Sequence, residues 1–90
     1  MRKADLVSYI ADYAGITKKD AEAALAGMTR GIETSLKRNE PVQLVGFGTF
    51  AVSHRKATTG RNPQTGAPIQ IPARNGVRFK AGKKLNEALN

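Results

Sequence analysis

The sequence predicts an α+β fold: an N-terminal helical hairpin, a three-stranded antiparallel sheet with a long protruding β-ribbon arm, and a short C-terminal helix. Apolar residues recur at helical spacing through the first 40 residues. Between residues 42 and 80 they alternate with polar ones, as in strands with one buried face. No acidic residue lies between Pro41 and Asn86, so the strand region is strongly cationic.

The chain has 90 residues, which is enough for one domain, predicted over 1–90. Within it we expect a helical body with the first strand (1–45), the sheet and arm (46–80) and the last helix (81–90). A domain of this size buries little surface alone, and oligomerisation is one usual remedy.

Charge is distributed unevenly along the chain. Residues 1–52 carry 7 basic and 6 acidic side chains, whereas residues 53–90 carry 8 basic and 1 acidic. A cationic surface without neutralising acids favours a polyanionic partner, most commonly nucleic acid. There is no cysteine, which excludes disulfides and thiol catalysis. The N-terminus lacks the continuous apolar core of a signal peptide, and no segment reaches the roughly 18 apolar residues of a membrane span. We therefore expect a soluble cytoplasmic protein.

Two helices are predicted before Pro41. Gly15 ends the first, and Thr17 caps the second with Asp20 three residues later. Asn39 and Pro41 end the second helix. The apolar residues at helical spacing are Leu6, Val7, Ile10, Ala11 and Ala14, then Ala21, Leu25, Met28, Ile32 and Leu36.

Such a hairpin also resembles a helix-turn-helix DNA reader. The second helix mixes Glu22 and Glu33 with its basic residues, which is a poor electrostatic match to a DNA groove. We therefore interpret the hairpin as scaffold.

The strand region predicts a hairpin with two different faces. A short strand at residues 42–45 and a turn centred on Phe47 precede a strand that starts at Thr49. The outer part, about residues 54–72, is too far from the body to be covered and should project as an arm. On the return strand, residues at alternate positions share a face. One face is apolar and holds Ile69, Ile71, Ala73, Val77 and Phe79. The other is polar or basic and holds Gln70, Arg74, Arg78 and Lys80.

The segment 60–66, GRNPQTG, lies in the middle of this arm. Asn-Pro and Thr-Gly are common turn chemistry, so an ordinary turn is the simplest interpretation. Because the flanking ribbon is acid-free, we favour a second interpretation, an apolar wedge at Pro63 between cationic flanks.

The last helix starts near Gly82, and Leu85 and Leu89 are expected to pack inward. Lys83 and Lys84 lie in its first turn, where the helix dipole disfavours cations unless an anion binds there. A solvated lysine pair is the alternative, and the nearby Lys80 favours a phosphate contact.

Three blocks together, residues 45–50 (VGFGTF), 60–66 (GRNPQTG) and 79–83 (FKAGK) with Leu85, resemble the HU family of bacterial histone-like DNA-binding proteins. Integration host factor is a close relative of that family. The resemblance runs from end to end and includes both N-terminal helices. The chain departs from the family at Ser53, Thr58 and Asn86, where many members carry basic residues.

The resemblance implies an intertwined homodimer with Phe47, Phe50 and Phe79 as the shared core. Two ribbon arms would reach into the DNA minor groove, and Pro63 would insert between base pairs and bend the duplex. The partner would be double-stranded DNA, and the protein would prefer DNA that is bent, nicked or gapped. The protein would be located in the bacterial nucleoid. The implied DNA contacts are Lys3, Arg55, Arg61, Asn62, Pro63, Gln64, Arg74, Arg78, Lys80 and Lys83.

The expected function is architectural, with little sequence specificity, a strong salt dependence and a role in nucleoid compaction. A sequence-preferring bender like integration host factor is the near alternative, because such specificity comes largely from DNA deformability. No cofactor, metal, membrane or small-molecule substrate is expected.

Three distant alternatives fit the sequence less well. A metal-dependent nuclease needs clustered carboxylates, yet Glu87 is the only acid in the cationic half. His54 is the only histidine, and we expect a solvated arm residue. An RNA reader often stacks bases on exposed aromatics, but only Tyr9 and Tyr13 are not assigned to the core. A basic membrane-surface helix is not favoured, since neither long helix pairs a cationic face with a large apolar one.

Overall fold

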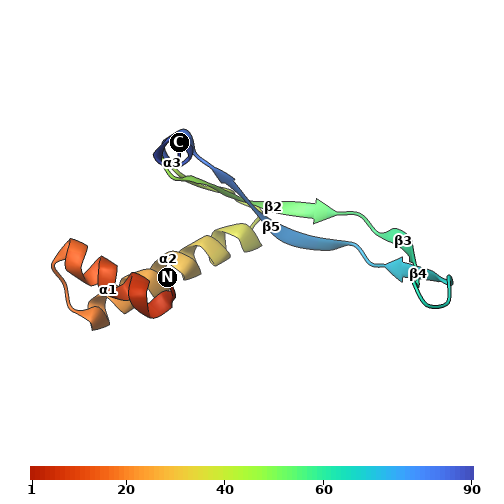
Figure 1. Cartoon of the computed structure of the whole chain (residues 1–90), viewed down its shortest axis with the longest axis horizontal. Coiled ribbons are helices and arrows are strands. Elements are labelled where there is room, and N and C mark those ends of the chain that lie inside the picture. The colour runs from red at the N-terminus through yellow and green to blue at the C-terminus, as the bar shows by residue number, and fades with distance from the viewer. The chain divides into compact units, whose positions relative to one another are not determined.

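A computed structural model describes all 90 residues, in two compact units, Met1–Ser35 and Leu36–Asn90. The elements follow the predicted order (Figure 1). They are α1 (Lys3–Ala14), α2 (Lys18–Lys37), β1 (Val42–Leu44), β2 (Gly48–Arg55), β3 (Thr58–Arg61), β4 (Pro68–Ile71), β5 (Arg74–Ala81) and α3 (Lys83–Ala88).

The first unit is the predicted helical hairpin. Gly15 takes the left-handed conformation, with φ 67°, and its N–H donates to the carbonyl of Ala11 at the end of α1. The N–H of Asp20 donates to Oγ1 of Thr17 at 3.1 Å, which caps the first turn of α2. Asn39 follows α2 with φ 58°, so the chain leaves the helix through a second left-handed residue. The predicted end of the first helix and the predicted start and end of the second are confirmed.

The apolar core of the first unit is very small. Only Val7, Ala11 and Ala21 are buried, and Ile10 and Leu25 pack against them. The burial of one valine and two alanine side chains cannot offset the conformational entropy of ordering about 35 residues. The helical hairpin therefore needs further apolar surface to cover it. Neither helix, nor α3, is long and apolar enough to cross a membrane.

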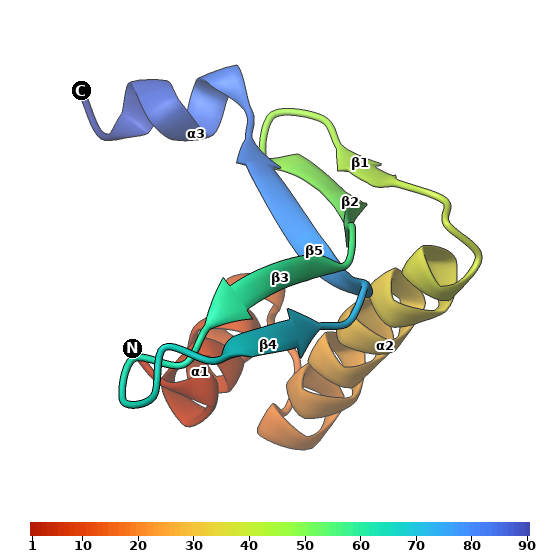
Figure 2. The same cartoon turned by 90° about the vertical axis from the view of Figure 1, so that its right-hand side faces the viewer.

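The second unit contains a three-stranded antiparallel sheet in the order β1-β2-β5, which confirms the predicted sheet (Figure 2). Val42 pairs with Phe50, and Phe50 in turn pairs with Phe79. Val45 was expected in the first strand but lies in the turn after it, almost fully exposed. The turn begins there because the N–H of Phe47 donates to the carbonyl of Leu44, and Gly46 has φ 86°.

Three phenylalanines cluster on one face of this sheet. The ring centroids of Phe50 and Phe79 are 4.8 Å apart, and those of Phe47 and Phe79 are 5.6 Å apart, in tilted arrangements. Phe47 remains 43% exposed and Phe79 42% exposed, so the cluster has an open side. Gly82 is tied to the same corner, since its N–H donates to the carbonyl of Phe47 at 2.8 Å.

Beyond the sheet, β2 and β5 continue into the β3–β4 ribbon, which ends in a turn (Figure 1). The ribbon is interrupted between two pairs, Arg55 with Arg74 and Thr58 with Ile71. The register is the same on both sides of the gap, since two residues intervene on each strand. Pro72 lies in the gap and has no amide hydrogen to donate. A projecting arm was predicted from the sequence, but this interruption of its ladder was not.

The C-terminal helix α3 is shorter than expected. It ends at Ala88, and Leu89 is 81% exposed, so the prediction that Leu89 packs inward is wrong. A helix of 6 residues presents less than two turns, and within this chain no element covers its last residue. Leu85 is half-buried.

Candidate nucleic-acid interface

The β2–β5 ribbon has one basic face and one apolar face, as its register requires. Paired residues of an antiparallel ladder project to the same side, and neighbours along a strand project to opposite sides. The apolar face holds the pairs Phe50 with Phe79 and Val52 with Val77. The basic face holds the pairs Thr49 with Lys80, Ala51 with Arg78, Ser53 with Gly76, and Arg55 with Arg74.

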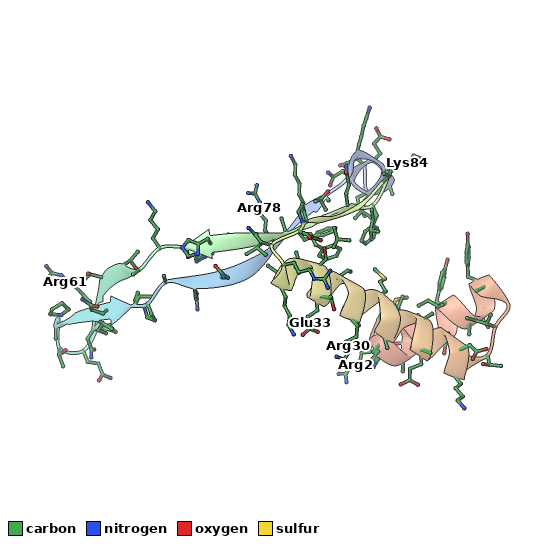
Figure 3. All side chains as sticks on the ribbon, turned by 180° about the vertical axis from the view of Figure 1, so that it is seen from behind. Arg2, Arg30, Glu33, Arg61, Arg78 and Lys84 are labelled. Carbon is green, nitrogen blue, oxygen red and sulfur yellow. The ribbon has the colours of Figure 1, made fainter.

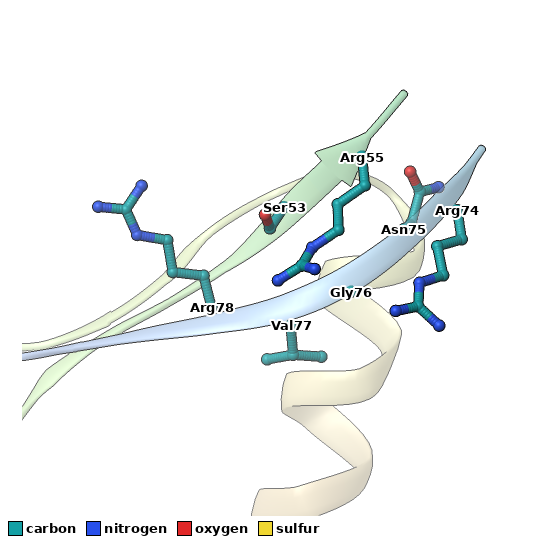
Figure 4. A pocket seen from close by; sticks show the side chains of 7 residues that line it. All are labelled: Ser53, Arg55, Arg74, Asn75, Gly76, Val77 and Arg78. Carbon is teal, nitrogen blue, oxygen red and sulfur yellow. The ribbon is translucent and has the colours of Figure 1, made fainter. Parts of the chain in front are cut away.

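Three arginines predicted to bind DNA come together on the basic face. Arg55, Arg74 and Arg78 line one open notch with Ser53 and Gly76 (Figure 4). Arg55 reaches it from β2, and Arg74 and Arg78 reach it from β5. Lys80 continues the same face toward the body of the sheet. No acidic residue lies between Pro41 and Asn86, so neighbouring positions in the ribbon supply no counter-charge.

The tip of the arm is a hydrogen-bonded turn built around Asn62. Its N–H donates to the carbonyl of Ala67 at 2.9 Å, and its own carbonyl accepts from Gly66 at 2.7 Å. The side-chain Oδ1 of Asn62 accepts from the N–H of Gln64 at 2.9 Å. Gly66 is left-handed, with φ 69°, which the closing turn requires. Asn62 was predicted as a DNA contact, and its carbonyl oxygens are in fact used inside the turn.

Pro63 lies at the crest of this turn and is exposed. The Asn62 bond to Gln64 spans it, so the ring is carried on a closed loop rather than on a free chain. Gln64 is exposed beside it, and Arg61 pairs with Pro68 at the last position of the β3–β4 ladder. Figure 3 shows Arg61 at this end of the ribbon and Arg78 nearer the sheet.

Two predicted lysines belong to helices rather than to the ribbon strands. Lys83 opens α3, where its Nζ is 3.8 Å from Oε1 of Glu87. Both side chains are largely exposed, so this ion pair is weak and easily exchanged for a phosphate. Lys3 is the first residue of α1 and belongs to the other unit.

One contact on the arm was missed by the sequence analysis. Nδ1 of His54 lies 2.7 Å from Oδ1 of Asn75, directly across the ladder on the side of the apolar face. His54 is exposed, as expected of an arm residue, but it is hydrogen-bonded rather than free. No group of three potential metal-ligating side chains occurs in the structure.

A basic β-ribbon that projects from a small sheet, ends in a proline turn and carries no acid defines the class of nucleic-acid-binding ribbon proteins. The family model described as bacterial DNA-binding protein matches residues 1–90. The chain belongs to this family, the HU family of bacterial DNA-binding proteins.

Individual relatives agree with this assignment. The chain is 55% identical over 89 residues to DNA-binding protein HU of Pasteurella multocida, covering 99% of each protein. It is 49% identical over 90 residues to DNA-binding protein HRm of Rhizobium meliloti, covering 100% of each. Among solved structures it resembles the Anabaena HU–DNA cocrystal structure, with a TM-score of 0.91 and 40% identity, covering 99% of this chain and 97% of that one.

Proposed function

We propose that this protein is an architectural DNA-binding protein that bends or stabilises double-stranded DNA with little sequence specificity. The observation that carries the proposal is the acid-free ribbon, which combines one basic face with an exposed proline at its tip. The relative solved with DNA has the same fold over 99% of this chain.

Binding is driven by neutralised phosphates. Each lysine or arginine that contacts a phosphate releases condensed counterions, so affinity falls steeply with salt. The arms enter the minor groove, and Pro63 wedges between base pairs, which costs a few kcal/mol per unstacked step. Bent DNA offsets this cost because it contacts more protein surface. The proposed DNA contacts are Lys3, Arg55, Arg61, Pro63, Gln64, Arg74, Arg78, Lys80 and Lys83.

The functional form is a homodimer. The first unit buries only three residues, and the phenylalanine cluster leaves Phe47 and Phe79 more than 40% exposed. Exposed aromatic surface of this kind is typical of an obligate interface. A second copy that covers Phe47, Phe50 and Phe79 completes a core that one chain lacks, and residues 1–90 act as one DNA-binding domain in that dimer.

The protein acts in the nucleoid, in the cytoplasm, as a binding protein and not as an enzyme. Strong sequence preference, as in integration host factor, is not favoured because similar proteins of known name include HU proteins. Compaction of the nucleoid follows if many copies bend DNA along its length.

Binding to one short duplex, intact and nicked, over a salt series tests the proposal. A nick removes stiffness, so an architectural bender binds the nicked duplex more tightly, and both affinities fall steeply as salt rises. Equal affinity for the two duplexes would mean that the protein is a simple polycation and that Pro63 is only a turn residue.

A further inference from the structure

The notch on the basic face of the ribbon has a specific use beyond general attraction to DNA. We propose that Arg55 and Arg74 hold a single DNA phosphate between them, over a floor formed by Ser53 and Gly76, with Arg78 on the far side. This inference rests on the proposed function, since it names the subsite that grips the backbone at the base of the arm.

Two like charges face each other at the end of the β2–β5 ladder. Arg55 and Arg74 are direct partners in the β2–β5 ladder, and they are the last pair before its interruption. Like charges directly opposite one another destabilise an antiparallel pair. Strand neighbours provide no relief, because the nearest acids in the sequence are Glu40 and Glu87. An anion shared by the two guanidinium groups reverses the sign of this interaction.

The floor of the notch is formed by two small residues. Ser53 and Gly76 are also direct partners, one pair further along the same face. They are the smallest pair there and lie between Arg55–Arg74 on one side and Ala51–Arg78 on the other. A Cβ placed on Gly76 would have no atom within 4 Å, so the space above it is open. The notch has a volume of about 640 Å³ and is open to solvent, which admits a phosphate that is part of a chain.

Hydrogen-bond donors line this space. Figure 4 shows Arg55 extending back along the ribbon toward Gly76, while Val77 points to the opposite side of β5. Each guanidinium can donate two parallel hydrogen bonds to phosphate oxygens, and the Ser53 hydroxyl can donate another from the floor. Carboxylate acceptors are absent from the lining. The hydrogen-bond donors and the absence of carboxylates therefore favour binding of a phosphodiester or another oxyanion.

The short side chain of Ser53 is important for the proposed phosphate site. Ser53 is a short, uncharged residue on a face whose other pairs carry Arg55, Arg74, Arg78 and Lys80. A short side chain at position 53 leaves room for the phosphate. A long side chain there would fill the space beside the Arg55 guanidinium group.

The first experiment narrows the notch at its floor without changing charge. Gly76→Val places a β-branched side chain on the floor, at a position where the structure has open space and where strands favour such residues. The thermal midpoint should stay equal or rise, while affinity for a nicked duplex falls by about tenfold, the worth of one charged hydrogen-bonded contact. Gly76→Ala serves as the graded control and should lose less affinity. Unchanged affinity in Gly76→Val would overturn the proposal.

The second experiment asks whether the two arginines share one phosphate. Arg55→Gln and Arg74→Gln should each lower the salt slope, log K against log salt, by about 1. Because one phosphate is lost in either case, the double variant should lose little more than each single variant. Arg61→Gln, at the arm tip, is the matched control and should add its loss in full to that of Arg55→Gln. Additive slopes for Arg55 and Arg74 would mean two separate phosphates and would overturn the shared site.

These outcomes are separable from failure of the proposed function. If the unaltered protein binds neither duplex, the proposed function itself is wrong. If the unaltered protein binds and bends DNA, and Gly76→Val binds and bends it equally well, only the proposed phosphate site in the notch is wrong. Titration with inorganic phosphate, followed through the amide resonances of Ser53 and Gly76, tests the anion source. Shifts at millimolar phosphate that vanish in Gly76→Val support the subsite, whereas identical shifts in both proteins contradict it.

Discussion

Gly48 lies directly against the ring of Phe79. A Cβ on Gly48 would lie 2.5 Å from Cζ of Phe79, closer than real Cβ contacts allow. The carbonyl oxygen of the next residue, Lys80, would be 2.7 Å away, so neither a ring shift nor a backbone shift alone relieves the clash. Gly48 is therefore required by packing at the start of β2, where its φ is not left-handed.

Gly48→Ala should destabilise the protein by about 1–3 kcal/mol, the usual cost of overpacking. Urea unfolding, compared at one protein concentration because the functional form is a dimer, measures the change. Gly76→Ala is the matched control, since its Cβ meets no atom within 4 Å. Equal losses in the two variants would show that the contact with Phe79 is not the cause.

Pro63→Ala should reduce DNA bending more than DNA affinity, because the wedge is lost while the phosphate contacts remain. Fluorescence transfer between the ends of a labelled duplex reports the bend, and a titration of the same duplex reports the affinity. Pro68→Ala is the control, since Pro68 lies in β4 opposite Arg61 and not in the turn. A bend that is unaltered in Pro63→Ala rules out the wedge.

Asn62→Ala should weaken bending through Pro63 even though the proline is kept, because the 2.9 Å bond from Gln64 to Oδ1 is lost. Asn62→Asp retains an oxygen at the same place and should restore most of the bend at high salt, where its added charge is screened. The same fluorescence-transfer assay applies. If Asp behaves like Ala at all salt concentrations, Asn62 acts through its amide nitrogen on DNA and not through the turn.

Phe79→Ala should weaken both the sheet and the dimer, because Phe79 contacts Phe47 and Phe50 and keeps an exposed side for a second copy. A loss of at least about 2 kcal/mol is expected from a large-to-small change in such a cluster. Sedimentation equilibrium should show more monomer. Tyr13→Ala is the control, since Tyr13 is 86% exposed on α1 and should have little effect. A dimer unaffected by Phe79→Ala contradicts the proposed interface.

Local chemistry made much of the fold predictable. Gly15 and the Thr17 cap determine where the two helices meet, and both act within a few residues of sequence. The two faces of the ribbon follow from the alternation of the sequence, because successive side chains along a strand point to opposite faces. The turn at the tip was recognisable from its Asn-Pro and Thr-Gly dipeptides. The hydrogen bonds that Asn62 makes inside this turn were not.

Features that depend on cross-strand register were not predictable. The Ser53–Gly76 floor and the His54–Asn75 contact exist only because positions more than 20 residues apart are paired. The ribbon interruption involves both strands, and Pro72 marks only one of them in the sequence. Leu89 was misassigned because the length of α3 depends on tertiary contacts that helical spacing does not report.

The most direct test of the central claim is the end-to-end distance of DNA when the unaltered protein binds it. Two short duplexes of unrelated sequence, each labelled at both ends and each with a central nick, are titrated at low salt. The account predicts that both shorten by a similar amount as binding saturates. Saturated binding with no change in either distance would contradict an architectural role, even if the affinity were high.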